Sequence, residues 1–309
     1  MTALARVLSL FVALVAGVAF GQPPGPVPAT GTADPRCASL DELMTSFVRE
    51  HGIPGAALAV AREGRLVYSR GFGFADLDRK EPVRPESLFR IASISKTLTS
   101  AAIMRLVEQG KLSLDDRPFV LLDVVPALKE GQKADERLAR ITVRDLLSHA
   151  GGFDRGQSGD PMFMSRRIAS DLHIPSPPGP RDIIRWVAAR PLDFDPGTKS
   201  VYSNFGYCVL GRVVEHASGE GYERYVQDQI LRPLGLTGMR IGRTLETGRA
   251  EGEVRYYSGE SGGRAVFDGV EGTVPSPYGC WCLESMDAHG GWIASASDLV
   301  RFAGALSEP

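Results

Sequence analysis

The chain has 309 residues, of which 43% are hydrophobic and 23% charged, as in an ordinary globular protein. This length allows a sizeable core in one large domain or two interleaved ones. A formal net charge of -2 gives no electrostatic case for binding nucleic acid or an anionic membrane, and the chain shows neither a nucleic-acid recognition motif nor a glycine-rich phosphate loop.

Residues 1–21 have the pattern of a signal peptide. Arg6 precedes an apolar run over residues 7–19, and a small-x-small triplet at residues 19–21 offers a cleavage site. The run is too short for a comfortable membrane span. We therefore expect export to the periplasm or the extracellular space, with no stable membrane anchor after cleavage.

The next part of the chain predicts a linker and then a compact start of the fold. Residues 22–38 are rich in proline and glycine, so we expect a linker that packs no core. A helix is expected up to Glu50, followed by a β-hairpin with strands at residues 56–62 and 65–68 around a Glu-Gly turn. Residues 72–78 are expected to form a polar loop.

Residues 88–110 predict a buried helix that carries a candidate nucleophile. Ser93 and Lys96 lie near its start, and residues three apart on a helix share one face, so the two side chains can meet. The plain alternative is that Ser93 caps the helix, but a capping box has Glu or Gln three residues on. A lysine there faces the positive end of the helix dipole. Together with burial, this field lowers the lysine pKa and lets it take the proton of a serine hydroxyl.

The second half of the chain predicts further helices and one long loop. Thr142 is expected to cap a helix over residues 143–148. Residues 155–180 are rich in Gly, Pro, Ser and Met and predict a long surface loop that could cover a site. Tyr202 directly precedes a helix that Gly219 ends. Further helices are expected to end at Arg190, Leu231 and Leu306.

The four cysteines leave several possibilities open. In an exported protein they allow three disulfide connectivities. Cys208 falls within a helical pattern and is expected to be a buried free thiol, while a bridge from Cys37 to Cys280 or Cys282 stays open. A zinc site at Cys280, Cys282 and His289 is disfavoured because a fourth ligand and the usual spacing are missing.

Three kinds of motif occur together. Ser-Ile-Ser-Lys stands at residues 93–96, Tyr-Ser-Asn at residues 202–204 after a Pro-Gly turn, and two framework stretches at residues 141–152 and 290–302. Together they resemble the serine β-lactamase / penicillin-binding protein superfamily. The match is best with its class C-like branch of β-lactamases, D-alanyl-D-amino acid peptidases and related esterases, from about Leu40 to the end.

The resemblance implies a role for each motif residue. Ser93 would attack a carbonyl and form an acyl-enzyme, with its backbone N–H as one oxyanion donor. Lys96 would accept the serine proton or supply charge, and Tyr202 would pass a proton to the leaving group. Asn204 would hold Lys96 and a substrate amide. His149 suggests a Ser-His-Asp triad, but in this family it is a framework residue. Neither a cofactor nor a metal ion is expected.

The sequence departs from the family at its third motif, Lys-Thr-Gly or His-x-Gly. His289-Gly-Gly fits His-x-Gly superficially but is read as framework, and the chain stops at Pro309 soon afterwards. We therefore expect the C-terminal sheet strands to be missing, an unpaired hairpin edge, and an uncovered apolar face on the Ser93 helix. Losing one oxyanion donor costs about 10²–10³ in rate. The hypothesis is a truncated product or a fragment of a longer reading frame.

The expected fold is α/β plus all-α: a β-lactamase/transpeptidase-like antiparallel sheet flanked by helices, with an inserted helical domain. Residues 39–114 and 285–309 would form the α/β part, and residues 115–284 the helical part. The expected function is an exported serine acyl hydrolase acting on an ester, a D-amino-acid peptide or a β-lactam. The alternative is a weak or inactive penicillin-binding-like module, or a fragment. The partner would be a small-molecule or peptidoglycan-like substrate, and the sequence leaves the oligomeric state open.

Overall fold

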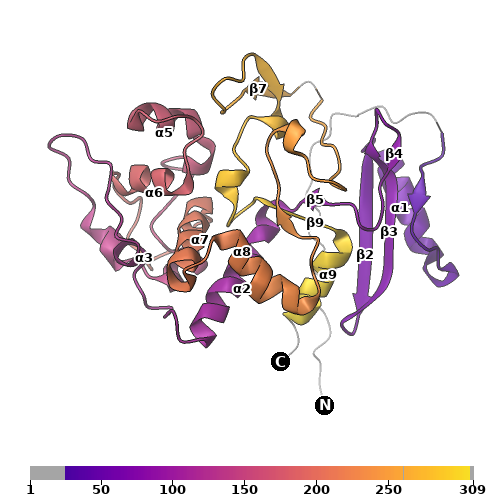
Figure 1. The fold of residues 1–309 in the computed structure, drawn as a ribbon, viewed down its shortest axis with the longest axis horizontal. Coiled ribbons are helices and arrows are strands. Elements are labelled where there is room, and N and C mark those ends of the chain that lie inside the picture. Colours follow the sequence, from indigo (N-terminus) through magenta and orange to yellow (C-terminus); the bar gives the residue numbers. More distant parts are fainter. Residues whose placement is uncertain (1–24, 260, 307–309) are drawn as a thin grey trace.

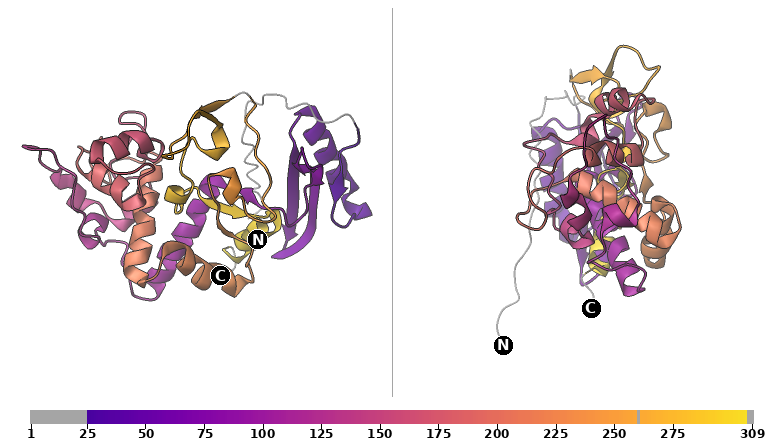
Figure 2. Two further views of the ribbon diagram at one scale, coloured as in Figure 1. Left: turned by 45° about the horizontal axis from the view of Figure 1, so that its top comes forward. Right: turned by 90° about the vertical axis from the view of Figure 1, so that its left-hand side faces the viewer.

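The computed structural model describes residues 25–259 and 261–306. The expected signal peptide, residues 1–21, lies outside these ranges. Figures 1 and 2 show the N-terminal sheet at one end of the molecule and a group of helices at the other, with the Ser93 helix between them. Within the described ranges, no helix is long and apolar enough to cross a membrane.

The first sheet is built on the predicted hairpin. Strands β2 (Gly55–Arg62) and β3 (Arg65–Asp76) are antiparallel. The turn residues Glu63 and Gly64 have φ angles of 51° and 71°, as in the type I′ turn that matches strand twist. In the described part of the chain β2 is the outer strand, so its far edge is unpaired there, as expected.

Two expectations about the flanks of this hairpin are wrong. Within the expected linker, residues 22–38, Ala29–Thr30 form strand β1, which pairs with β3. Residues 72–76, expected in a loop, continue β3 and pair in part with strand β4 (Glu81–Pro82). Pairing satisfies the backbone donors and acceptors of these segments, and this outweighs the bias of their composition towards loop.

Two helices cover the faces of this sheet. Helix α1 (Ala38–Glu50) packs on one face and helix α9 (Ala296–Ala305) on the other, so the two ends of the described chain meet here (Figure 1). The fully buried Val48 and Phe72 and the buried Tyr68 form the core between α1 and the sheet.

A second sheet lies beside the nucleophile segment. Its strands are β5 (Phe89–Arg90), β9 (Trp292–Ala294) and β6 (Arg240–Ile241), in the order β5-β9-β6 and antiparallel. Because β6 comes from residues 115–284, that part contributes a strand and is not purely helical. A third pair, β7 and β8, spans residues 262–264 and 273–275.

The remaining helices surround the Ser93 helix. Their bounds are α2 Ser95–Glu108, α3 Pro118–Leu121, α4 Val143–Leu147, α5 Ser165–Leu172, α6 Pro180–Ala188, α7 Asn204–Ser218 and α8 Tyr222–Val226, the last continued by a π-helical turn over Gln227–Leu231. The predicted stops hold, since Gly110 and Gly219 have φ angles of 67° and 74°. Thr142 forms the expected cap of α4, as a full capping box with Asp145.

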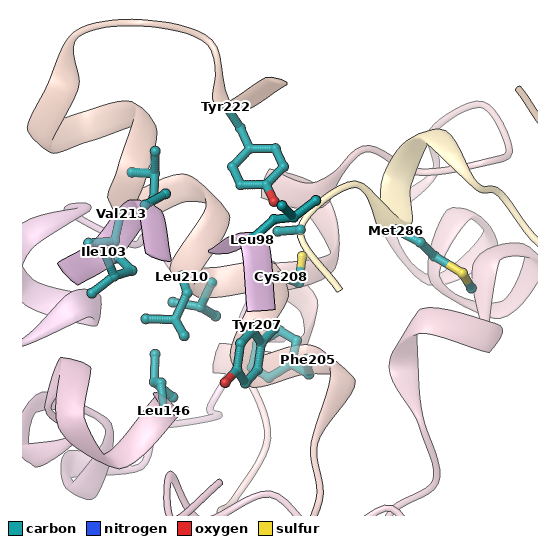
Figure 3. Packing of buried hydrophobic residues seen from close by; sticks show 14 of the residues in the cluster. Leu98, Ile103, Leu146, Phe205, Tyr207, Cys208, Leu210, Val213, Tyr222 and Met286 are labelled. Carbon is teal, nitrogen blue, oxygen red and sulfur yellow. The ribbon is translucent and has the colours of Figure 1, made fainter. Parts of the chain in front are cut away.

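Helix α2 is covered more fully than expected. Leu98, Ile103 and Leu106 are fully buried, and helices α7 and α8 pack against α2. Figure 3 shows Leu98 and Ile103 in this cluster of buried side chains. The expected uncovered apolar face is therefore wrong for most of the helix. Two large apolar side chains of this region stay exposed, Ile94 at 48% and Met104 at 41%.

The expected long loop over residues 155–180 is also wrong in part. It contains helix α5, whose Ile168 and Ala169 are buried. Ile168 and Leu172 are four residues apart and thus share one face, a short helical pattern that the surrounding Gly and Pro obscured. All four cysteines are free in the structure, and Cys208 is fully buried as predicted.

Candidate active site

Ser93 lies at the junction between the second sheet and helix α2. It sits in a 3₁₀ turn, Ala92–Ile94, directly before the helix. The turn is held because Ile91 N donates to the backbone oxygen of Trp292 at 3.0 Å. Ala92 has a φ angle of 44°, a left-handed conformation that is costly for a residue with a β-carbon. The Ser93 side chain is thus presented on a constrained turn, exposed to solvent.

Lys96 is one turn further on, and it is buried. Only 6% of the residue is exposed. Its Nζ donates to Asn204 Oδ1 at 2.7 Å, to the backbone oxygen of His289 at 2.8 Å and to Ser93 Oγ at 3.3 Å. An ammonium has three donors, and here each has an acceptor. The ammonium is therefore fixed towards the serine.

Burial lowers the pKa of Lys96 to about 8, and the charges around it act in both directions. Asp160 raises the pKa, whereas Arg155 lowers it. With a pKa near 8, roughly one tenth of the lysine is neutral at pH 7, compared with far less for a free lysine. Lys96 can therefore act as a base near neutral pH.

Tyr202 provides the second group in contact with the nucleophile. Its hydroxyl lies 2.5 Å from Ser93 Oγ, so the two hydroxyls share a hydrogen bond. Lys96 Nζ lies 4.8 Å from the centre of its ring, and the Arg155 guanidinium 5.0 Å from it. Two cations thus lie close enough to the Tyr202 ring to be attracted by its aromatic face.

His149 supports Tyr202 and is not in a triad arrangement. Its ring centre is 4.8 Å from that of Tyr202, and its Nδ1 accepts a hydrogen bond from Ser203 N at 3.2 Å. Burial and the charge of Lys96 lower the pKa of His149, which favours its neutral form. This position agrees with the framework role expected for it.

Asn204 connects Lys96 to a residue that sequence reasoning missed. It is the first residue of α7, which Ser203 caps by accepting from Gly206 N. Its Nδ2 donates to Asp160 Oδ2 at 2.7 Å. Asp160 falls in the segment read as a loop, and an Asp-Pro pair there indicated no more than a turn.

The segment at His289 serves the site through its backbone. Its carbonyl accepts from Lys96, while its side chain is 2% exposed and its pKa is lowered by burial to about 3. The segment is therefore framework, in agreement with the sequence interpretation. The described residues contain no group of three His, Cys, Asp or Glu side chains that could hold a metal ion.

A pocket of about 300 Å³ opens beside Ser93. Most of its wall away from the serine is apolar, with Phe163, Trp281, Leu283 and Met286 as the large side chains. Of the four predicted site residues, Ser93 and Asn204 line this pocket, and hydrogen bonds connect Lys96 and Tyr202 to Ser93.

The family model described as Beta-lactamase matches residues 40–309. The chain belongs to the beta-lactamase family. Its relatives in this family include the esterase EstB of Burkholderia gladioli, 32% identical over 78% of this chain and 60% of the relative. Penicillin-binding protein 4 of Amycolatopsis lactamdurans is 32% identical over 86% of this chain and 62% of the relative. The chain thus spans less than two thirds of the length of these two relatives.

Two solved structures show the same fold. The octameric penicillin-binding protein homologue from Pyrococcus abyssi has a TM-score of 0.63 and 26% identity, over 88% of this chain and 57% of that one. The hydrolase EstCE1 has a TM-score of 0.63 at 24% identity, over 86% of this chain and 71% of that one. The β-lactamase/transpeptidase-like fold expected from the sequence is therefore confirmed.

Proposed function

We propose that this chain is a serine acyl hydrolase that acts through an acyl-enzyme on Ser93. The observation that carries the proposal is the position of Ser93 Oγ, 2.5 Å from the Tyr202 hydroxyl and 3.3 Å from Lys96 Nζ. A serine hydroxyl is a weak nucleophile unless an adjacent group takes its proton. Here two candidate proton carriers lie within reach of the same oxygen.

The reaction would proceed in two halves. As Ser93 Oγ bonds to the substrate carbonyl carbon, its proton passes to neutral Lys96, directly or through the Tyr202 hydroxyl. The bond from carbon to the leaving group then breaks, and the leaving group takes a proton through Tyr202. Water attacks the acyl-enzyme by the reverse route and frees Ser93.

The pocket beside Ser93 supports an apolar acyl group. Phe163 and Trp281 give it aromatic walls, and Leu283 and Met286 add aliphatic surface. Apolar walls with few polar groups favour burial of an apolar ligand. We therefore propose a neutral ester or amide with an apolar acyl part as substrate. Within the proposal, the protein acts after export, for which the N-terminal segment with Arg6 is the support.

The test is hydrolysis of p-nitrophenyl butyrate by the full chain, compared with Ser93→Ala. The proposal predicts that Ser93→Ala abolishes turnover. It also predicts that wild-type turnover rises with pH through about 8, as Lys96 loses its proton. A fluorophosphonate should add once to the wild type, at Ser93. Turnover retained by Ser93→Ala would overturn the proposal. One equivalent of acylation without turnover would favour the penicillin-binding-like alternative instead.

A further inference from the structure

The amide of Asn204 is held from both of its ends. Its Oδ1 accepts from Lys96 Nζ at 2.7 Å, and its Nδ2 donates to Asp160 Oδ2, also at 2.7 Å. Asn204 is 9% exposed, so little water competes for either contact. Both contacts involve a charged group, and such hydrogen bonds are stronger than those between neutral groups.

The orientation of this amide decides whether Lys96 keeps the shortest of its three hydrogen bonds. The oxygen and nitrogen ends of an asparagine have nearly the same shape, so packing alone does not choose between them. If the Asn204 amide turned over, its NH₂ group would face the Lys96 ammonium, and a buried donor would lose its acceptor. Asp160 prevents this, because a carboxylate accepts hydrogen bonds and offers none to the amide oxygen.

Asp160 is itself fixed by the backbone. Its Oδ1 accepts from Met162 N at 3.1 Å, at the start of the 3₁₀ turn Pro161–Phe163. Both carboxylate oxygens therefore accept hydrogen bonds at once, one from the turn and one from Asn204. An asparagine at position 160 has only one carbonyl oxygen, so it could accept in this way from either Met162 N or Asn204 Nδ2 but not from both.

We propose that Asp160 is a positioning residue for the Lys96 base, acting by fixing the Asn204 amide with its oxygen towards the lysine. This inference rests on the proposed function of the Ser93 site. Asp160 makes no hydrogen bond to Ser93 or Lys96, so its effect on the orientation of the base is transmitted by Asn204, while its charge also acts on Lys96 through space.

The charges around Lys96 add a second, measurable consequence. Asp160 favours the protonated lysine and Arg155 disfavours it, while burial lowers the pKa of both His149 and His289 and so favours their neutral forms. Removing the Asp160 charge should lower the pKa of Lys96, and removing that of Arg155 should raise it.

A matched control separates this role from simple capping of the turn. Asp34 precedes Pro35 and accepts from Arg36 N at the start of another 3₁₀ turn, far along the chain from the site. Asp34→Asn and Asp160→Asn therefore remove the same kind of capping carboxylate, but only the second removes a partner of Asn204.

The first experiment is a double-mutant cycle on the full chain, read by the rate of Ser93 labelling with a fluorophosphonate. Asp160→Ala should slow labelling about tenfold or more, as expected for loss of a hydrogen bond to a charged group. In the background of Asn204→Ala it should slow labelling less than about twofold, because the intermediary is gone. Equal effects in both backgrounds would overturn the inference while leaving Ser93 as the nucleophile.

The second experiment does not need activity. The pKa of Lys96 is measured by NMR on lysine-labelled protein, with Lys96→Met for assignment. Asp160→Asn should lower that pKa, Arg155→Gln should raise it, and Asp34→Asn should leave it unchanged. If the pKa of Lys96 is the same in Asp160→Asn as in the wild type, the inference is wrong, whether or not the wild type is active. An inactive wild type would instead contradict the proposed function.

Discussion

The burial of Lys96 predicts a pH dependence of folding stability that belongs to this one residue. Its pKa is about 8 in the folded protein and 10.5 for a free lysine, a difference worth about 3 kcal/mol because one pKa unit corresponds to about 1.4 kcal/mol. Because the folded pKa is the lower one, the unfolded chain binds more protons between these values. Stability therefore rises with pH in this window, and the cost of the buried charge is present in full below pH 8.

The size of the effect can be isolated with Lys96→Met. Between pH 7 and pH 9.5 the linkage relation gives the wild type a gain of about 2 kcal/mol that the variant lacks. The measurement is urea unfolding followed by tryptophan fluorescence at both pH values, where other titrating groups cancel in the difference. Lys111→Met, at an exposed lysine just beyond α2, is the control and should show no such change. The reasoning is refuted if the difference in unfolding free energy between the wild type and Lys96→Met is the same at pH 7 and pH 9.5.

Three further changes test other parts of the structure. Tyr202→Phe should keep the fold by circular dichroism and lower ester turnover by about 10²–10⁴, the usual contribution of a positioned proton carrier; near-wild-type turnover would count against its role. Gly211→Ala would place a β-carbon 2.6 Å from that of Ala288, so urea unfolding should show a loss of about 1–3 kcal/mol, and no loss would mean that the contact is relieved. Arg212→Met leaves the Asp287 carboxylate without its buried partner and should lower the free energy of unfolding by about 3–5 kcal/mol at pH 7. Burial raises the pKa of Asp287, so at acid pH this carboxyl takes up a proton and the loss should be smaller; an equal loss at acid pH would contradict the prediction.

Local signals in the sequence predicted much of what surrounds the site. The Ser-x-x-Lys spacing predicted that Ser93 and Lys96 meet, and the Tyr-Ser-Asn motif placed Tyr202 before a helix. These inferences hold because hydrogen bonding within a turn or a helix depends on residues a few positions apart. The resemblance to the family then predicted that these two segments form one site.

Contacts between segments that are far apart in the sequence could not be predicted from local sequence patterns. Asp160 reaches Asn204 across 44 residues, and no pattern in a Pro- and Gly-rich segment marks that carboxylate. The His289 contribution is a backbone carbonyl, which every residue carries, so the sequence holds no sign of it. Strand β1 was missed for a related reason, because it exists only where β3 offers an edge to pair with.

The hydrogen bonds of Lys96 also bear on how the protein folds. The two shortest hydrogen bonds of Lys96 have acceptors that are 108 and 193 residues away in the sequence. Each forms only after a long loop has closed, and closing that loop costs conformational entropy. Contacts of such sequence separation favour slow folding. A chain with α2 formed but the distant segments undocked would lack both the Trp292 contact at the Ser93 turn and the acceptors that orient Lys96. The rate at which Ser93 becomes reactive during refolding would therefore report the completion of long-range assembly, later than any signal from helix formation.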